Sequence, residues 1–396
     1  MFFNCHFFVT LQRNDLLNPE CGSDPRSVFP RPLSHNLTTV GDIQPPSKGM
    51  ITFVTLKDNF ARMKKSLAYI LLLTLSTTMS CSSKASDNKD SNESERQVTT
   101  VLGSFNSDSA YRFVADQVAF GPRNPNSKGH KACGNYLVDK LKSFNPDTII
   151  IQESVVTAFN GDKLDMKNIM ARYNVAAPNR VLLVAHWDTR PWADMEGNIE
   201  RRQEPILGAN DGASGVGVLL EIARNLDMKA PECGVDILFV DDEDYGNSDG
   251  FMSNDDTWCL GTQYWVKNMP YKIGDRKPAY GILLDMVGGK DAVFHREYNS
   301  HLNARAATVK IWSEARMLGY DSTFINKVGG TVVDDHLFLT EAGIPTTNII
   351  ENMNPHTLNF PPTWHTHDDN LDNISKESLE AVGKTVLNVI YKEKKR

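Results

Sequence analysis

The sequence lacks two features that would point to nucleic acid or to a cysteine-held metal. Its 42 Lys and Arg are outnumbered by 49 Asp and Glu, which gives a net charge of −7, and no long basic run stands out. Because phosphate binding depends on clustered Lys and Arg, we expect no nucleic-acid partner. The six cysteines include no CxxC or CxxxC pair, so a cysteine-based zinc or redox site has no support.

What remains is ordinary globular composition. The chain of 396 residues is 40% hydrophobic and 23% charged, with 26 Gly and 19 Pro, which excludes collagen-like, coiled-coil and wholly disordered chains. No internal repeat is visible. Ten His and many Asp leave a metal site built from imidazole and carboxylate open.

The N-terminal hundred residues have the pattern of a targeting region. Residues 63–65 are Met-Lys-Lys, an apolar run spans 67–75, and small residues follow up to Cys81. This is the order of a secretory signal, and the apolar run is far below the ~20 residues that a membrane-spanning helix needs. We predict a non-native extension over 1–62, with translation starting at Met63, and a signal peptide over 63–80.

Cys81 resembles the lipidated cysteine of a bacterial lipoprotein, and an ordinary cleaved signal peptide is the alternative. The polar, aromatic-free residues that follow predict a disordered tether over 81–100. We expect an exported, monomeric protein on the periplasmic side of a bacterial membrane, held by its lipid anchor only, or soluble in the periplasm if Cys81 is not lipidated. The folded body is then 101–396, a single catalytic domain. It contains three cysteines, Cys133, Cys233 and Cys259, which allow one disulfide and one free thiol.

Strand and helix patterns alternate along this body. Apolar, β-rich runs occupy 148–154, 168–173, 181–185, 235–240, 280–285 and 346–350, and several are continuously apolar, as in strands buried on both faces of a parallel sheet. Helical patterns occupy 107–120, 129–144, 212–226, 260–268, 304–318, 336–341 and 375–391. The alternation predicts an α/β fold: one three-layer α/β/α domain with a mostly parallel mixed central sheet.

Polar side chains follow three of these strands. His186-Trp187-Asp188 follows the run 181–185, four acidic residues at 241–244 follow 235–240, and Asp285 ends 280–285. Sites of open α/β sheets gather at the carboxyl ends of strands. We therefore expect these groups to meet at one edge of the sheet.

Five elements together indicate a zinc site. They are His186-x-Asp188, Asn210-Asp211-Gly212, Glu243-Asp244, Asp285, and the segment 364–370, which contains Trp364 and His365. A catalytic zinc takes about three N/O ligands and leaves one position open, and it needs a nearby carboxylate that moves protons. Each element alone has a plainer interpretation: a structural histidine, a turn with a helix cap, a solvated acidic loop or core packing.

The motifs HWDTRPWAD, GANDGASGVGVLLEIAR, FVDDED, LLDMVG and WHTHDDN resemble the superfamily of zinc-dependent aminopeptidases of the M28 type and their relatives. Within it, they most resemble the bacterial glutaminyl cyclases. Aminopeptidases typically carry Glu-Glu and Tyr-His-Thr, whereas this chain has Glu243-Asp244 and Trp364-His365-Thr366. The animal cyclases have a His where this chain has Asn348.

The resemblance implies a zinc-exopeptidase-like fold, one zinc per chain and a reaction that turns the N-terminal glutamine of peptides or proteins into pyroglutamate. It implies Asp211, Asp244 and His365 as metal ligands and Glu243 as general base and acid. Asp285 and Asp334 would form an acidic network behind the site. Trp364 and Phe360 would line the substrate pocket, with Trp187 and Trp192 at its mouth.

Two other functions stay open. His186 completes the ligand set of the two-zinc aminopeptidases, with Asp188 beside it, so a second metal and peptide-bond hydrolysis are possible on residue identity. A tethered binding protein without catalysis is the third hypothesis, which the intact Glu243 disfavours.

Overall fold

A six-stranded sheet is the centre of the computed structural model, which describes residues 103–248, 255–271 and 275–394. The predicted extension 1–62, the signal peptide 63–80 and the tether 81–100 with Cys81 lie outside the described residues. Among the described helices, none is both long and apolar enough to span a membrane. The described residues belong to one compact unit, Asn92–Arg396.

The sheet is mixed and mostly parallel, as the sequence predicts. Its order is β1 (Thr148–Thr157), β2 (Lys163–Tyr173), β4 (Gly234–Val240), β3 (Arg180–His186), β5 (Tyr280–Leu284) and β8 (Thr346–Ile349). The pairs from β4 to β8 are parallel, whereas β1–β2 and β2–β4 are antiparallel. All residues of β3 and β4 are buried, as expected for central strands with both faces covered. β1 and β8 are the edge strands, and β1 leaves Ile151 and Val155 exposed.

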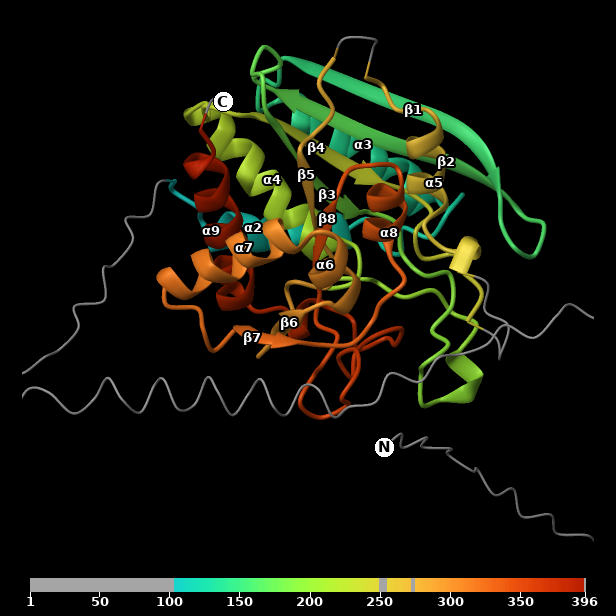
Figure 1. The fold of residues 1–396 in the computed structure, drawn as a ribbon. Helices are drawn as coiled ribbons and strands as arrows, with labels where there is room; N and C mark the ends of the chain where they lie inside the picture. The colour runs from blue at the N-terminus through green and yellow to red at the C-terminus, as the bar shows by residue number, and fades with distance from the viewer. Residues whose placement is uncertain (1–102, 249–254, 272–274, 395–396) are drawn as a thin grey trace, which may run out of the picture. The chain divides into compact units, whose positions relative to one another are not determined.

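Helices cover both faces of the sheet and complete the predicted three layers (Figure 1). One face packs on α2 (Ser107–Val118), α3 (Lys128–Lys142), α4 (Ala213–Met228), α7 (Arg305–Met317) and α9 (Lys376–Lys392) in the larger core. The other face packs on α5 (Leu260–Lys267) and α8 (Asp335–Glu341) in a smaller core. Alternate residues of one strand serve the two cores, as Leu183 and Val184 of β3 do.

Several short elements were not anticipated from the sequence. They are α6 (Tyr298–Asn303), the two-stranded sheet of β6 (Phe294–Arg296) and β7 (Phe324–Val328), and the 3₁₀ turns η1 (Ile199–Arg201), η2 (Asp255–Thr257) and η3 (Leu371–Asn373). The cysteines Cys133, Cys233 and Cys259 are all buried and unpaired with one another, so the disulfide that the sequence allowed is not formed among them.

Candidate metal centre

Three parallel strands deliver polar side chains to one edge of the sheet. β3 ends at His186, β4 is followed directly by the acidic residues 241–244, and β5 is followed by Asp285. Two further segments reach the same place: the turn before α4, which carries Asp211, and the segment that carries His365. The carboxyl ends of the strands therefore hold the centre, as expected for an open α/β sheet.

Asp211, Asp244 and His365 form a buried group of possible metal ligands. Their donor atoms all lie within 4.8 Å of one another. His365 Nε2 is 3.2 Å from Asp244 Oδ1 and 3.7 Å from Asp211 Oδ2. Asp244 Oδ2 is buried without a hydrogen-bond partner, which is costly unless a cation or proton satisfies it. One imidazole and two carboxylates are a donor set that suits zinc, so these residues fit the ion.

A second group shares Asp211 with the first. It contains His186, Asp211 and Asp285, whose donor atoms also lie within 4.8 Å of one another. His186 Nε2 is 3.1 Å from Asp211 Oδ1 and 3.2 Å from Asp285 Oδ1. The centre therefore contains two groups of possible metal ligands that share Asp211.

The centre carries an excess of negative charge. Burial alone would lower the pKa of His186, but Asp188, Asp211 and Asp285 outweigh it and raise that pKa well above its ordinary value. Burial likewise opposes the charge on His365, whereas Asp244 and Asp194 raise its pKa to about 9. The raised pKa values of both histidines reflect the excess of carboxylates around them, and a bound cation would offset this negative charge.

Two aspartates hold the turns that carry the ligands. Asp188 accepts hydrogen bonds from the backbone amides of Glu243 and Asp244, both at 3.1 Å. Asp369 accepts from the amides of Asn210 and Asp211 at 2.7 and 3.0 Å. Asp188, predicted as a possible second-metal or supporting residue, belongs to neither of the two ligand groups. Its oxygens bind backbone instead.

His365 is fixed from behind by Asp194. Its Nδ1 lies 2.9 Å from Asp194 Oδ1, which leaves Nε2 to face Asp211 and Asp244. Arg190 in turn donates to Asp194 and to the backbone oxygen of Asp244. Its guanidinium lies over the rings of Trp192 and Trp258, at 4.9 and 4.8 Å from their centroids. A carboxylate behind a ligating imidazole sets the orientation and basicity of the ring.

Glu243 lies beside the ligands without belonging to either ligand group. Its Oε2 is 3.9 Å from His186 Nδ1, and its Oε1 accepts from the Cys259 thiol at 3.4 Å. Burial, followed by the charges of Asp244, Asp334 and Asp335, raises the pKa of Glu243 well above its ordinary value, although His186 works the other way. A buried carboxyl with a raised pKa is suited to exchange protons with a substrate.

Asp334 faces the same region from the start of α8. It is the N-cap residue of that helix, and its carboxylate accepts from the amide of Asp335 and from Asn348 Nδ2, both at 2.6 Å. Burial and the charges of Asp285 and Asp335 raise the pKa of Asp334 well above its ordinary value. Asn348, which stands where animal cyclases have a His, thus anchors this carboxylate.

A cavity of about 250 Å³ opens onto these groups. Its lining includes Asp211, Glu243, Asp244, Asp285, Asp334 and His365 on one side and Trp258, Val332, Ile350, Phe360 and Trp364 on the other. Phe360 and Trp364 lie with ring centroids 4.6 Å apart, and Trp364 stacks on His365 at 3.8 Å. The volume is below the ~300–1,000 Å³ of sites for drug-sized ligands, so it suits a single residue.

The two tryptophans predicted at the mouth of the pocket lie elsewhere. Trp187 is fully buried, stacks on His130 and donates to the backbone oxygen of Lys167. Trp192 packs edge-on against Tyr245 in a small separate cluster, and neither tryptophan lines the cavity. The prediction was wrong for Trp187 because its indole packs on His130 and bonds to Lys167 instead of lining the cavity.

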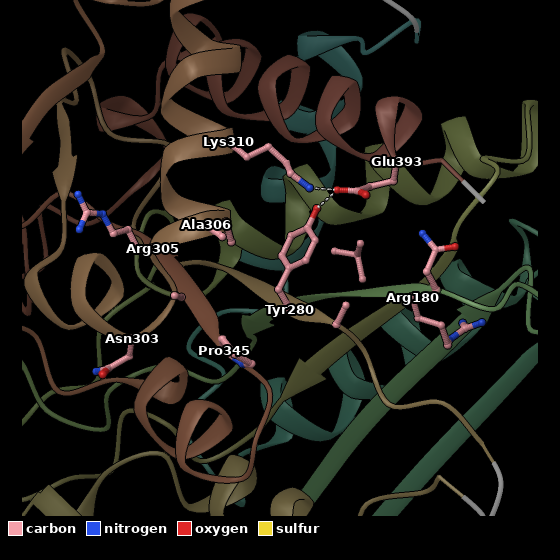
Figure 2. Close-up of a pocket in the computed structure, with 13 residues that line it drawn as sticks. Arg180, Tyr280, Asn303, Arg305, Ala306, Lys310, Pro345 and Glu393 are labelled. Carbon is pink, nitrogen blue, oxygen red and sulfur yellow. Dashed lines mark hydrogen bonds and ion pairs between the residues drawn. The ribbon is translucent and has the colours of Figure 1, made fainter. Parts of the chain in front are cut away.

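Another cavity lies at the opposite end of the strands and carries none of this chemistry. Figure 2 shows Lys310 and Tyr280 both bonded to Glu393 beside it, with Pro345 and Ala306 on its apolar side. Its volume is about 360 Å³, and it is lined by residues at the amino ends of β3 and β5. It holds no group of metal-type ligands among the described residues.

Sequence reasoning missed several residues of the site. Trp258, Asp194, Asp369 and Cys259 were not singled out, although Asp194 and Asp369 lie inside the quoted motifs HWDTRPWAD and WHTHDDN. Their roles depend on which backbone amides or ring nitrogens they meet across the fold. Only Asp194, four residues after Arg190 in the same motif, offered a local signal.

Comparison with known proteins identifies relatives of this arrangement. The model of peptidase family M28 matches residues 168–390. The aminopeptidase YwaD of Bacillus subtilis is 26% identical over 69% of this chain. The matched region spans 55% of that protein, so this chain corresponds to about half of it.

Solved structures from Bacteroidota are more similar. A glutaminyl cyclase of Bacteroides thetaiotaomicron, bound to N-acetylhistamine, is 49% identical over 73% of this chain and 99% of its own, with a TM-score of 0.70. A structure from the same organism described as a leucine aminopeptidase precursor is 49% identical over 73% and 98%, with a TM-score of 0.69. The Tannerella forsythia glutaminyl cyclase is 46% identical over 74% and 100%, with a TM-score of 0.70.

Proposed function

This chain belongs to peptidase family M28, and we propose that it is a glutaminyl cyclase, which converts the N-terminal glutamine of peptides or proteins into pyroglutamate and releases ammonia. The observation that carries this is the small cavity in which Glu243 and the group of Asp211, Asp244 and His365 face an aromatic wall. The likeness to two glutaminyl cyclases, over nearly the whole length of each, supports the same reaction.

The chain's own residues divide the work of the reaction. Glu243 accepts a proton from the α-ammonium of the substrate, which frees the amine to attack the γ-carbonyl carbon of the same residue. The new C–N bond closes the ring, and the ring nitrogen gives up its surplus proton to solvent. Glu243 delivers the proton it holds to the amide nitrogen as the bond from the γ-carbon to that nitrogen breaks, and ammonia leaves. When bound by Asp211, Asp244 and His365, one zinc ion supplies Lewis-acid polarisation of the γ-carboxamide.

Positioning is much of the task because the reaction is intramolecular. Phe360 and Trp364 form a wall against which the methylenes of the glutamine side chain pack. Asp285 and Asp334 line the same cavity as Glu243, and burial raises the pKa of both carboxyls, so the acidic group can hold a proton as the charge on Glu243 changes. Ring closure then depends on holding the amine against the carbonyl carbon rather than on recruiting water.

A two-zinc aminopeptidase is the second candidate, favoured by the ligand group of His186, Asp211 and Asp285 that shares Asp211 with the first. On the cyclase proposal this group binds no metal, and His186 stays hydrogen-bonded to the carboxylates around it. Replacement of His186 by Gln should then leave the zinc content unchanged. Loss of zinc in His186→Gln would favour the aminopeptidase.

We further propose export of the chain, on the basis of its sequence alone. The signal-like order of residues 63–80 followed by Cys81 supports a lipid-anchored protein on the periplasmic side of a bacterial membrane. N-terminal glutamines that signal cleavage leaves on other exported chains would be substrates there.

The experiment is an ammonia-release assay with a peptide that begins with Gln. The purified chain should release ammonia, lose this activity after treatment with a chelator, and regain it on addition of zinc. A peptide that begins with Asn is the control, since its shorter side chain does not close a five-membered ring in the same way. Release of ammonia that persists in the metal-free protein would contradict the assigned role of the metal group.

A further inference from the structure

We propose a second metal site, formed by His130, Asp241 and Asp242, that binds a divalent transition-metal ion such as zinc and braces the turn that carries Glu243 and Asp244. The three residues are buried, and their donor atoms lie within 4.8 Å of one another. None of them belongs to the catalytic groups described above. The proposal does not depend on the reaction assigned to the enzyme.

Asp242 is the residue that most needs a partner. It is fully buried, and neither of its carboxylate oxygens has a hydrogen-bond partner. An unpaired buried carboxylate is costly, and a bound cation removes that cost. Its oxygens lie within ligand reach of His130 and Asp241.

The backbone at Asp242 adds to this picture. Its φ is 52°, in the left-handed region that residues other than Gly adopt uncommonly. Asp and Asn tolerate this conformation better than most residues, and strained backbone tends to persist where the surroundings or a function require it. Here the conformation keeps an acidic side chain inside the protein next to a second acid, Asp241.

The geometry repeats the pattern of the catalytic centre. His130 Nε2 lies 2.8 and 3.0 Å from the two carboxylate oxygens of Asp241. In the catalytic group, His365 Nε2 lies 3.2 Å from Asp244 Oδ1, and an oxygen of Asp244 also lacks a hydrogen-bond partner. Donors that share one zinc at ~2.0–2.2 Å lie about 3 Å or more apart, so both groups come close to this spacing.

His130 borders a second cavity, and a neighbouring ring packs on its imidazole. A cavity of about 510 Å³ lies between α3 and the β1–β2 pair, and His130 is part of its lining. Its acidic residues Glu153 and Asp165 pair with Lys167 and Lys131, which also line it. Trp187 stacks on the His130 ring at 4.4 Å and fixes its plane. His130 is thus the member of the group that borders this cavity, which is separate from the substrate cavity. A set of one imidazole and two carboxylates favours zinc or a related transition metal over Ca²⁺ or Mg²⁺.

The ion would stabilise the segment that the catalytic centre needs. Asp241 already accepts from the amides of Asp242 and Lys167, at 2.9 and 2.6 Å, and the bond from Lys167 joins the end of β4 to β2. Glu243 and Asp244 follow immediately in the chain. A metal held by α3 and this turn would add a link to the turn, besides the hydrogen bonds that Asp188 accepts from Glu243 and Asp244.

The test measures zinc in the full chain after metal removal, reloading with excess Zn²⁺ and gel filtration. We expect Asp242→Asn and His130→Gln each to bind one zinc ion fewer per chain than the wild type. The Asn side chain tolerates the backbone conformation, and the Gln amide can still donate to Asp241, so either variant can decide if the other fails to fold. Asp165→Asn, which removes a nearby acid outside the group, should retain the wild-type zinc content.

A second measurement separates this site from the catalytic one. In the variant His365→Gln, which lacks a catalytic ligand, added Zn²⁺ should still raise the melting temperature, because an ion that binds only the folded state stabilises it. The double variant His365→Gln with Asp242→Asn should show no such rise.

Wild-type zinc content in both Asp242→Asn and His130→Gln would overturn the proposal and identify Asp242 as a protonated carboxyl. Loss of the additional ion in His186→Gln would instead place it in the catalytic centre and also overturn the proposal. A failed ammonia-release assay, by contrast, would count only against the cyclase reaction.

Discussion

Asp188 and Asp369 illustrate how carboxylates outside both ligand groups can decide where the ligands lie. Each accepts two backbone hydrogen bonds from a turn that carries a ligand, at Glu243–Asp244 and at Asn210–Asp211. Because these oxygens are occupied by amide donors, the side chains of Asp211 and Asp244 are left free to face the metal position. The ligands are thus held through their backbone as well as through their own contacts.

Replacement of Glu243 by Gln should abolish turnover while zinc stays bound. The amide keeps the size of the side chain but does not accept a proton from the substrate, so we expect kcat to fall by about 10²–10⁴-fold. Zinc content, measured on the same preparation, is the control. Loss of zinc in Glu243→Gln would reassign the residue as a ligand.

Replacement of Asp194 by Asn should weaken zinc binding through His365. The carboxylate lies 2.9 Å from His365 Nδ1, and loss of such a support typically lowers metal affinity or activity by about 10–100-fold. Competition with a chelator measures the change. Asp368→Asn, in an exposed neighbour on the same segment, is the matched control and should bind zinc as the wild type does.

The sequence predicted which individual residues meet in the metal centre, but it did not predict all the residues that hold them in place. The members of the two ligand groups and Glu243 follow strand ends or lie in recognisable motifs, and the structure brings them together. Trp187 and Trp364 both adjoin a histidine of the centre, yet only Trp364 lines the cavity. Trp187 follows β3 directly and packs on His130, whereas Trp364 lies in an irregular segment beside His365, whose φ is 55°.

Helix α8 shows how an element can serve the site and the fold at once. Its N-cap residue, Asp334, lines the cavity. One residue into the helix, His336 turns the other way, and its Nε2 lies 3.1 Å from Glu297 Oε2 at the start of α6. The pair His336–Glu297 ties α8 to α6, so the position of Asp334 depends on a contact outside the cavity.

The contribution of Glu297 to stability should depend on pH. Burial opposes its charge, but His336 and the amides of Ser300 and Asn299 outweigh burial and lower the pKa of Glu297 to about 2. A carboxyl whose pKa is lower in the folded state than the ordinary 4.5 stabilises the fold above pH ~4.5, and this stability is lost as the pH falls through about 2. The shift corresponds to about 3 kcal/mol.

Urea unfolding measured between neutral pH and pH ~2 tests this, since the slope of stability against pH reports bound protons. Glu297→Gln should be less stable at neutral pH and should lose less stability on acidification than the wild type. Glu341→Gln, at an exposed position of α8, is the control and should follow the wild type. An identical pH slope for Glu297→Gln and the wild type would contradict the assignment.

Regular elements were largely predictable, because their patterns are local. The strands β3, β4 and β5 and the helices α2, α4 and α9 begin and end within about two residues of their predicted bounds, the uncertainty common to such assignments. β2 begins at Lys163, five residues before the predicted strand, since its first half pairs with β1 and buries only alternate residues such as Leu164 and Met166. α6, β6 and β7 are short, and their formation depends on contacts that local pattern does not encode.

At the scale of the whole molecule, the order of the strands in the sheet determines where the metal centre forms. Its ligands come from positions as distant as His186 and His365, and parallel strand order brings them to one edge. Both cores and both helix layers serve to hold that edge. The long-range arrangement was foreseeable from alternating strands and helices, whereas the pairing of supporting carboxylates with backbone amides was not.

Removal of the proposed lipid attachment should change where the protein is found. In a bacterial host that processes lipoproteins, the full chain should fractionate with membranes, and Cys81→Ser should not be acylated. Incorporation of labelled fatty acid into the wild type but not into Cys81→Ser is the measurement, and Cys133→Ser, at a buried cysteine, is the control. Absence of label in the wild type would contradict lipidation and favour an ordinary signal peptide.

The most direct test of the central claim is the mass of the product formed from one peptide with N-terminal glutamine. The zinc-loaded chain should convert it to a peptide of unchanged length whose mass is lower by one ammonia, and a matched peptide with N-terminal leucine should stay intact. Release of free glutamine or leucine with a peptide shortened by one residue would contradict the cyclase and identify a hydrolytic aminopeptidase.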